Sequence, residues 1–132
     1  RLARVHWLVD ALCPYVPSGG GRSIHDPEAR RAVLSYGALT GRLARELHRV
    51  VHHARQALPA VAAPTLVIHA RADNRIAPPA AETAYRTLGA PRKALVWLDG
   101  CGHVVSVDYE RERVFALTAA WLDDHAAPPP SP

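Results

Sequence analysis

Two short apolar segments on either side of a helical segment constrain the fold of this chain more than any other feature. The runs TLVIHA (residues 65–70) and KALVWL (residues 93–98) have the length and the apolar content of β-strands. Between them, residues 78–88 begin with two prolines and are followed by Gly89, which is the pattern of a short helix. A strand, a helix and a second strand predict a crossover unit of an α/β fold, with the two strands parallel.

Each predicted strand is followed by a residue with acid or base chemistry, Asp73 after the first and His103 after the second. The carboxyl ends of neighbouring parallel strands lie at one edge of the sheet, so we expect these two side chains to meet. A carboxylate that accepts a hydrogen bond from one ring nitrogen of a histidine fixes the tautomer in which the other nitrogen is a base. The sequence therefore predicts an acid–histidine pair.

The segments APTLVIHARAD (residues 63–73) and GCGHVVSVDYERE (residues 100–112) resemble the carboxyl-terminal half of α/β-hydrolases, and most of all bacterial carboxylesterases and monoacylglycerol lipases. The resemblance covers residues 59–124. It implies an α/β-hydrolase fold preceded by helical lid segments, an ester substrate, no cofactor, and a Ser-His-Asp triad to which Asp73 and His103 belong. One departure is Cys101, where the family usually has serine.

The nucleophile of such a triad has no candidate in this chain. It is expected in a G-x-S-x-G turn between a strand and a helix, and no serine has glycine both two residues before and two residues after it. Ser23 lacks the following glycine, Ser35 lacks the preceding one, and neither follows an apolar strand. Because the sequence also begins without methionine, we expect the nucleophile to lie upstream and the chain alone to be inactive.

The sequence divides into a helical lid or cap region (residues 1–58), the carboxyl-terminal part of the hydrolase core (59–125) and a proline-rich tail (126–132) that we expect to be disordered. In the lid region, Thr40 is a suitable N-cap for an amphipathic helix that ends near Leu58. Its apolar face could pack on the body of the domain or line an acyl pocket. The sequence leaves both roles open, and packing is the simpler one.

Other residues near the predicted pair have alternative roles. Asp99, at the end of the second strand, is the rival acid, whereas Asp108 suits the N-cap of a helix over residues 109–124. Ile76 and Val104 are expected in the wall of the acyl site because they lie next to the pair. Cys101 is a poor nucleophile because a residue two positions from His103 seldom presents its side chain for proton transfer.

Composition and motifs argue against several other functions. The net charge is +4, but the arginines are scattered among acidic residues, so no nucleic-acid surface is expected. His48 and His52 lack a third ligand, so no metal is expected. No apolar run is long enough for a membrane span and no signal pattern is visible, which makes reduced cysteines (Cys13 and Cys101) in a cytoplasmic protein the default.

Two expectations concern the whole molecule. Two parallel strands leave exposed edges, so the chain should need the missing amino-terminal half for folding and should aggregate alone. Ester hydrolysis is the leading function. Serine peptidase, epoxide hydrolase or dehalogenase chemistry, or a non-catalytic remnant or interaction module, are the alternatives.

Overall fold

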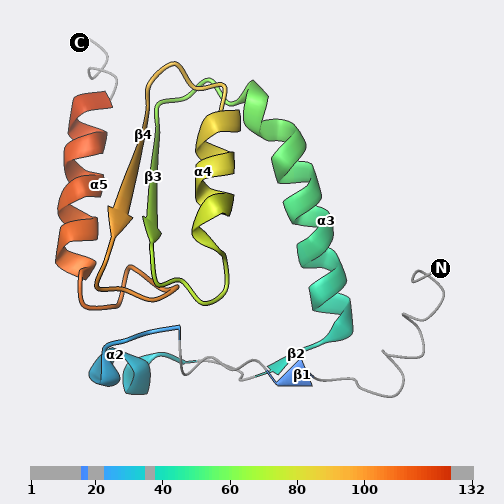
Figure 1. Cartoon of the computed structure of the whole chain (residues 1–132), viewed down its shortest axis with the longest axis vertical. Coiled ribbons are helices and arrows are strands. Elements are labelled where there is room, and N and C mark those ends of the chain that lie inside the picture. The colour runs from blue at the N-terminus through green and yellow to red at the C-terminus, as the bar shows by residue number, and fades with distance from the viewer. Residues whose placement is uncertain (1–15, 18–22, 35–37, 126–132) are drawn as a thin grey trace, which may run out of the picture.

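The computed structural model of the chain describes residues 16–17, 23–34 and 38–125. Cys13, Ser35 and the tail 126–132, on which some of the predictions fall, lie outside these residues. The elements of the described part are, in chain order, β1 (Val16–Pro17), α2 (Pro27–Ala32), β2 (Ala38–Leu39), α3 (Gly41–Ala57), the 3₁₀ turn η3 (Leu58–Ala60), β3 (Thr65–Ala70), α4 (Pro78–Thr87), β4 (Lys93–Leu98) and α5 (Arg111–His125) (Figure 1).

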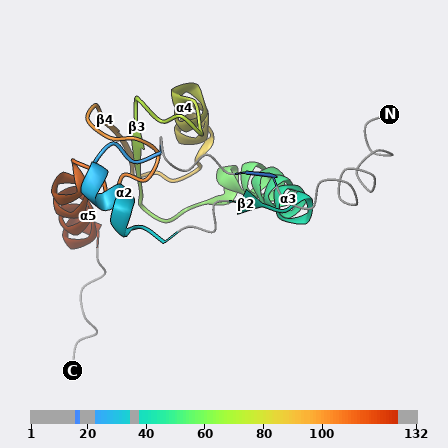
Figure 2. The same ribbon diagram turned by 90° about the horizontal axis from the view of Figure 1, so that it is seen from below.

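The two predicted strands are β3 and β4, and they pair in parallel from Thr65 opposite Lys93 to Ala70 opposite Leu98. Helix α4 forms the crossover between them and begins with two prolines, as the sequence predicts. Figures 1 and 2 show α4 and α5 on opposite faces of this sheet. The predicted α/β class, with parallel strands and crossover helices, is confirmed. A second, antiparallel pair joins β1 and β2, two residues each.

The small core lies where β3 and β4 end. Ala70, Leu98, Cys101 and Val114 are buried together, and Ile68 and Val105 pack against them. Because Ala70 and Leu98 are the last residues of their strands, the loops that follow both strands start from fixed points. The core thus holds in place the edge of the sheet where the acid–histidine pair is expected.

Helix α3 has the predicted cap and an exposed apolar face. Thr40 is its N-cap as predicted, and its hydroxyl accepts a hydrogen bond from the backbone N–H of Leu43 at 3.1 Å. The apolar side chains along α3, however, remain exposed within the described residues: Leu43, Leu47, Val50 and Val51. Figures 1 and 2 show the helix standing apart from the sheet except near its carboxyl end. Both roles predicted for this face, packing on the body of the domain and lining an acyl pocket, stay predictions.

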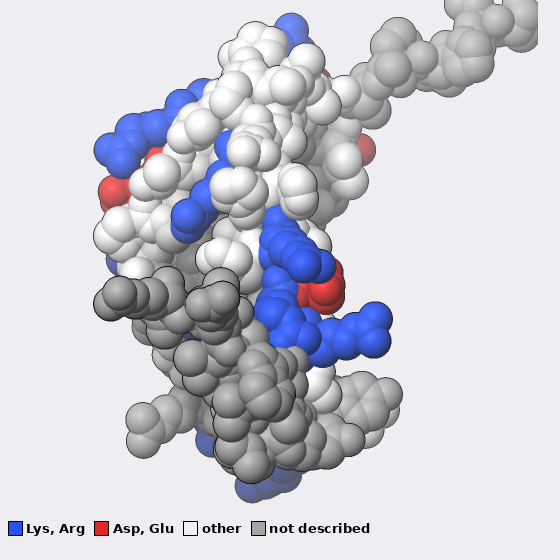
Figure 3. Space-filling view, turned by 90° about the vertical axis from the view of Figure 1, so that its right-hand side faces the viewer, with Lys and Arg blue, Asp and Glu red and all other residues white. Residues whose placement is uncertain are grey.

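The basic side chains of α3 are interspersed with apolar ones and with one acidic residue, Glu46. Figure 3 shows Lys and Arg side chains along the face that includes α3, with acidic side chains among them. One such neighbour pair is Arg49 and Glu46, whose Nη1 and Oε1 atoms are 3.0 Å apart. Exposed pairs of this kind contribute little to stability.

Candidate active site

Asp73 and His103 are brought together at the carboxyl ends of β3 and β4. The Nδ1 atom of His103 lies 2.9 Å from Oδ2 of Asp73, which is hydrogen-bonding distance. The Asp73 side chain is only 4% exposed, whereas that of His103 is 37% exposed. The carboxylate is thus enclosed by protein while the imidazole remains accessible from solvent.

Both oxygens of Asp73 are held by neighbouring groups. Oδ1 accepts hydrogen bonds from the backbone N–H groups of Arg75 (2.7 Å) and Ile76 (2.9 Å), while Oδ2 faces His103. Burial raises the pKa of Asp73, but the hydrogen bonds from His103, Ile76 and Arg75 prevail and hold the pKa below its ordinary value. Asp73 is therefore an ionised acceptor whose orientation is set by the turn that follows β3.

The rival acid, Asp99, lies elsewhere. Its side chain is 80% exposed and pairs with Arg71, whose Nε atom is 3.2 Å from Oδ1 of Asp99. The guanidinium group of Arg71 also lies over the ring of Trp97, 4.7 Å from the ring centroid. Asp99 thus has a surface partner, and Asp73 is the carboxylate that meets His103.

Asp108 has a different role from the predicted N-cap. Helix α5 begins three residues later, at Arg111, and the Asp108 side chain is fully buried. Its carboxylate accepts four backbone N–H bonds, from His25 (2.9 Å), Asp26 (2.8 Å), Gly102 (2.7 Å) and Tyr109 (2.9 Å). Burial raises the pKa of Asp108, yet these bonds outweigh it and the pKa is lowered. The N-cap prediction is wrong because tertiary contacts use the carboxylate to join two segments.

Gly102 allows those two segments to come close. A Cβ atom at this position would lie 2.6 Å from the carbonyl oxygen of Ser23, closer than real Cβ contacts allow. The same carbonyl oxygen accepts a hydrogen bond from the N–H of Val104 at 3.1 Å. The loop that carries His103 is therefore docked on residues 23–26 by backbone contacts on both sides of the histidine.

Ser23 is a packing residue in this arrangement. It is buried, its hydroxyl lies 3.3 Å from Oδ1 of Asn74, and it accepts a hydrogen bond from Nε of Arg75 at 3.0 Å. No hydrogen bond joins its hydroxyl to His103 in the described part of the chain. These contacts of Ser23 are those of a packing residue rather than of a nucleophile paired with His103.

Cys101 is enclosed in the core with no exposed surface. Its sulfur accepts a hydrogen bond from the N–H of Glu110 at 3.4 Å. Burial raises the pKa of the Cys101 thiol above its ordinary value, which disfavours the reactive thiolate. Cys101 is accordingly a small apolar residue of the core rather than a partner of His103.

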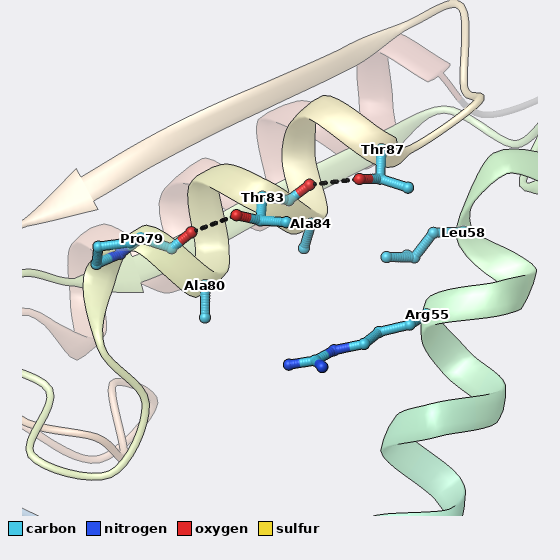
Figure 4. Close-up of a pocket in the computed structure, with 7 residues that line it drawn as sticks. All are labelled: Arg55, Leu58, Pro79, Ala80, Thr83, Ala84 and Thr87. Atoms are coloured by element: carbon cyan, nitrogen blue, oxygen red, sulfur yellow. Dashed lines mark hydrogen bonds between the residues drawn. The ribbon is translucent and has the colours of Figure 1, made fainter.

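Neither Ile76 nor Val104 lines the pocket that lies between α3 and α4. Ile76 is 47% exposed and Val104 is partly buried. The pocket has a volume of about 460 Å³ and is lined by Arg55, Leu58, Pro79, Ala80, Thr83, Ala84 and Thr87. Figure 4 shows Arg55 extending from α3 toward α4, and the hydroxyls of Thr83 and Thr87 bonded to carbonyl oxygens of their own helix (2.8 Å each).

Within the described ranges, no three His, Cys, Asp or Glu side chains are grouped so that they could hold a metal ion. No helix in the same ranges has the length and hydropathy needed to cross a membrane.

The arrangement of strands, crossover helix and acid–histidine pair defines the chain as part of an α/β-hydrolase. The chain belongs to the Hydrolase_4 family, described as serine aminopeptidase, S33, which it matches over residues 5–110. It is thus a member of a family of serine hydrolases.

Solved structures support the same fold. The chain is similar to the structure reported for LipS and LipT, two metagenome-derived lipolytic enzymes, with 26% identity and a TM-score of 0.76 over 85% of this chain and 44% of that one. It is also similar to a monoacylglycerol lipase of Paleococcus ferrophilus, with 17% identity and a TM-score of 0.77 over 95% of this chain and 52% of that one. A soluble variant of the monoglyceride lipase of Saccharomyces cerevisiae matches with 17% identity and a TM-score of 0.72, over 95% of this chain and 49% of that one. The chain therefore spans about half the length of these structures.

Proposed function

We propose that this chain supplies the acid and the base of a Ser-His-Asp triad in a carboxylic ester hydrolase of the carboxylesterase or monoacylglycerol lipase type. The observation that carries the proposal is the 2.9 Å contact between His103 Nδ1 and Asp73 Oδ2, with the carboxylate buried and the imidazole accessible. Since Nδ1 donates to the carboxylate, Nε2 carries the lone pair and is the general base. The likeness to lipolytic enzymes favours an ester as the substrate.

The proposed reaction is acyl transfer to water. A serine outside this chain attacks the ester carbonyl carbon, and Nε2 of His103 takes the proton of the serine hydroxyl. The imidazolium returns this proton to the leaving alkoxide, which departs as the alcohol. A water molecule, deprotonated by His103, then attacks the carbonyl carbon of the acyl-enzyme. The bond to the serine oxygen breaks as His103 returns the proton to that oxygen, and the carboxylic acid is released. Asp73 remains ionised throughout and holds the imidazolium. In this proposal Ile76 and Val104 line the acyl site because they adjoin the pair.

The placement of the serine outside the chain has two supports. No serine in the 132 residues meets the G-x-S-x-G pattern. The chain spans about half of the related structures, which leaves room for a nucleophile and an oxyanion hole on another segment.

The test joins the chain to the protein segment encoded immediately before it. We expect hydrolysis of p-nitrophenyl butyrate and labelling by a fluorophosphonate, both abolished to background by His103→Ala. His125→Ala, on α5, is the matched control and should retain activity. A segment without G-x-S-x-G, or an enzyme whose activity is unaffected by His103→Ala, would contradict the proposal.

A peptidase is the second candidate, because the family description names a serine aminopeptidase. The same triad cleaves amides and esters, so the pair itself does not choose between them. Comparing p-nitrophenyl esters with aminoacyl p-nitroanilides decides: turnover of the anilides alone favours the peptidase.

A further inference from the structure

His69 is a second histidine on the Asp73 carboxylate. It is the fifth residue of β3, four positions before Asp73, and its Nε2 atom lies 3.4 Å from Oδ2 of Asp73. This oxygen is the one that faces Nδ1 of His103. The two rings thus approach one carboxylate oxygen, while the backbone N–H groups of Arg75 and Ile76 occupy the other.

The other nitrogen of His69 identifies where its proton must be. Nδ1 of His69 lies 2.9 Å from the carbonyl oxygen of Ala70, and a carbonyl oxygen only accepts, so Nδ1 donates. In a neutral ring, Nε2 would then present a lone pair to a carboxylate oxygen. Nε2 is a buried nitrogen without a hydrogen-bond partner in this structure, since its 3.4 Å approach to Oδ2 lacks hydrogen-bond geometry, and such a nitrogen is costly. A proton on Nε2 turns its close approach to Oδ2 into an attractive contact between opposite charges.

Within the part of the chain that the structure describes, Nε2 of His69 is bonded to no other acceptor. The side chain is 12% exposed, and its ring forms a T-shaped contact with the ring of Trp97 of β4, with centroids 5.7 Å apart. Arg71 lies over the same Trp97 ring and is paired with Asp99. The contacts of His69 therefore direct Nε2 at Asp73.

We propose that His69 is a positioning residue whose protonated Nε2 forms an ion pair with Oδ2 of Asp73, holding this carboxylate in the orientation in which it accepts from His103. The proposal rests on the proposed function, since it concerns the acid of that triad. The Asp73 carboxylate is then held by three groups: the backbone N–H groups of the turn after β3, the ring of His103, and the ring of His69 on β3.

Two substitutions of His69 separate this role from simple packing. His69→Gln keeps an N–H donor near the position of Nε2 but loses the aromatic ring, whereas His69→Phe keeps the ring shape and loses the donor. A positioning role predicts that the Gln variant stays within about threefold of the parent kcat, and that the Phe variant loses about tenfold or more in kcat at unchanged KM, as for other residues that orient catalytic groups. A packing role predicts the opposite order. Equal activity of the Phe variant and the parent would overturn the proposal, and His125→Phe is the matched control.

A spectroscopic measurement makes the test independent of activity. Long-range ¹H–¹⁵N correlation spectra of the same joined protein, without substrate and at the pH of the assay, report whether each ring nitrogen carries a proton. We expect His69 to be protonated on Nε2, with the resonance assigned by its loss in His69→Gln. An unprotonated Nε2 refutes the inference. Absence of esterase activity in the parent refutes the proposed function alone, because the ring proton is still read.

Discussion

The Asp108→Asn substitution tests whether one buried carboxylate holds the loop that carries His103 against residues 23–26. Oδ2 of Asp108 accepts from the N–H groups of His25 and Gly102, and Oδ1 accepts from those of Asp26 and Tyr109. Each oxygen therefore joins residues 23–26 to the loop before α5. Asparagine replaces one oxygen with an NH₂ group, so whichever oxygen is lost, one N–H donor from each segment faces another donor.

The expected cost follows from the two orphaned donors. Leaving a buried donor unpaired costs about 1–3 kcal/mol, so the substitution should destabilise the protein by about 2–6 kcal/mol. Native domains are stable by about 5–15 kcal/mol, which makes this a large fraction. The control, Asp123→Asn, makes the same chemical change on the exposed surface of α5 and should stay within about 0.5 kcal/mol.

The contribution of Asp108 to the free energy of unfolding should also depend on pH. The pKa of Asp108 in the folded protein is below its ordinary value. A group with a depressed folded-state pKa stabilises the protein at pH values above its unfolded-state pKa, about 3.9 for Asp, and loses this contribution as the pH falls through the folded-state pKa. The difference in stability between parent and Asp108→Asn should therefore be full at pH 7 and shrink below about pH 4.

The assay is urea denaturation of the protein joined to its preceding segment, followed by tryptophan fluorescence at pH 7 and at pH 3.5. Hydrogen exchange of the Gly102 and Asp26 amides adds a local readout, because both should exchange faster in the variant. A loss of stability no larger than that of Asp123→Asn would refute the account of Asp108. So would a loss that is the same at both pH values.

Three further outcomes are expected. Gly102→Ala should destabilise the protein by about 1–3 kcal/mol and lower kcat, because the new Cβ atom meets the backbone of residues 23–26. The control is Gly100→Ala, whose Cβ atom meets only the end of the flexible Glu110 side chain, at 3.2 Å. Equal effects of the two substitutions in urea denaturation and kinetics would contradict this reasoning. In a Cys13→Ser variant, the thiol of Cys101 should not react with Ellman's reagent until urea unfolds the protein. Reaction of this thiol in the native state would contradict its burial. The 132-residue chain alone should hydrolyse p-nitrophenyl esters no faster than its His103→Ala variant. It should also aggregate, or melt without a sharp transition, through the open edges of the two-stranded sheet of β3 and β4. A monomer with a cooperative thermal transition in calorimetry would be the contrary result.

The local elements were predictable because each is encoded in neighbouring residues. The strand runs, the prolines at the start of α4 and the Thr40 cap act over a few positions, and the structure has these elements with nearly the predicted bounds. The meeting of Asp73 and His103 was also predictable, because two parallel strands present their carboxyl ends at one edge. The sequence by itself thus determined the α/β unit and its acid–histidine pair.

The uses of Asp108, His69 and Gly102 were decided only by the tertiary structure. Asp108 is a plausible helix cap in the sequence, but the docking of residues 23–26 brings four N–H donors around it and α5 starts later. His69 reads as an ordinary strand residue until the turn after β3 folds Asp73 back over it. The contacts of Asp108 and Gly102 form between segments that are far apart in the sequence. Local sequence patterns do not indicate which distant segments come together in the folded chain.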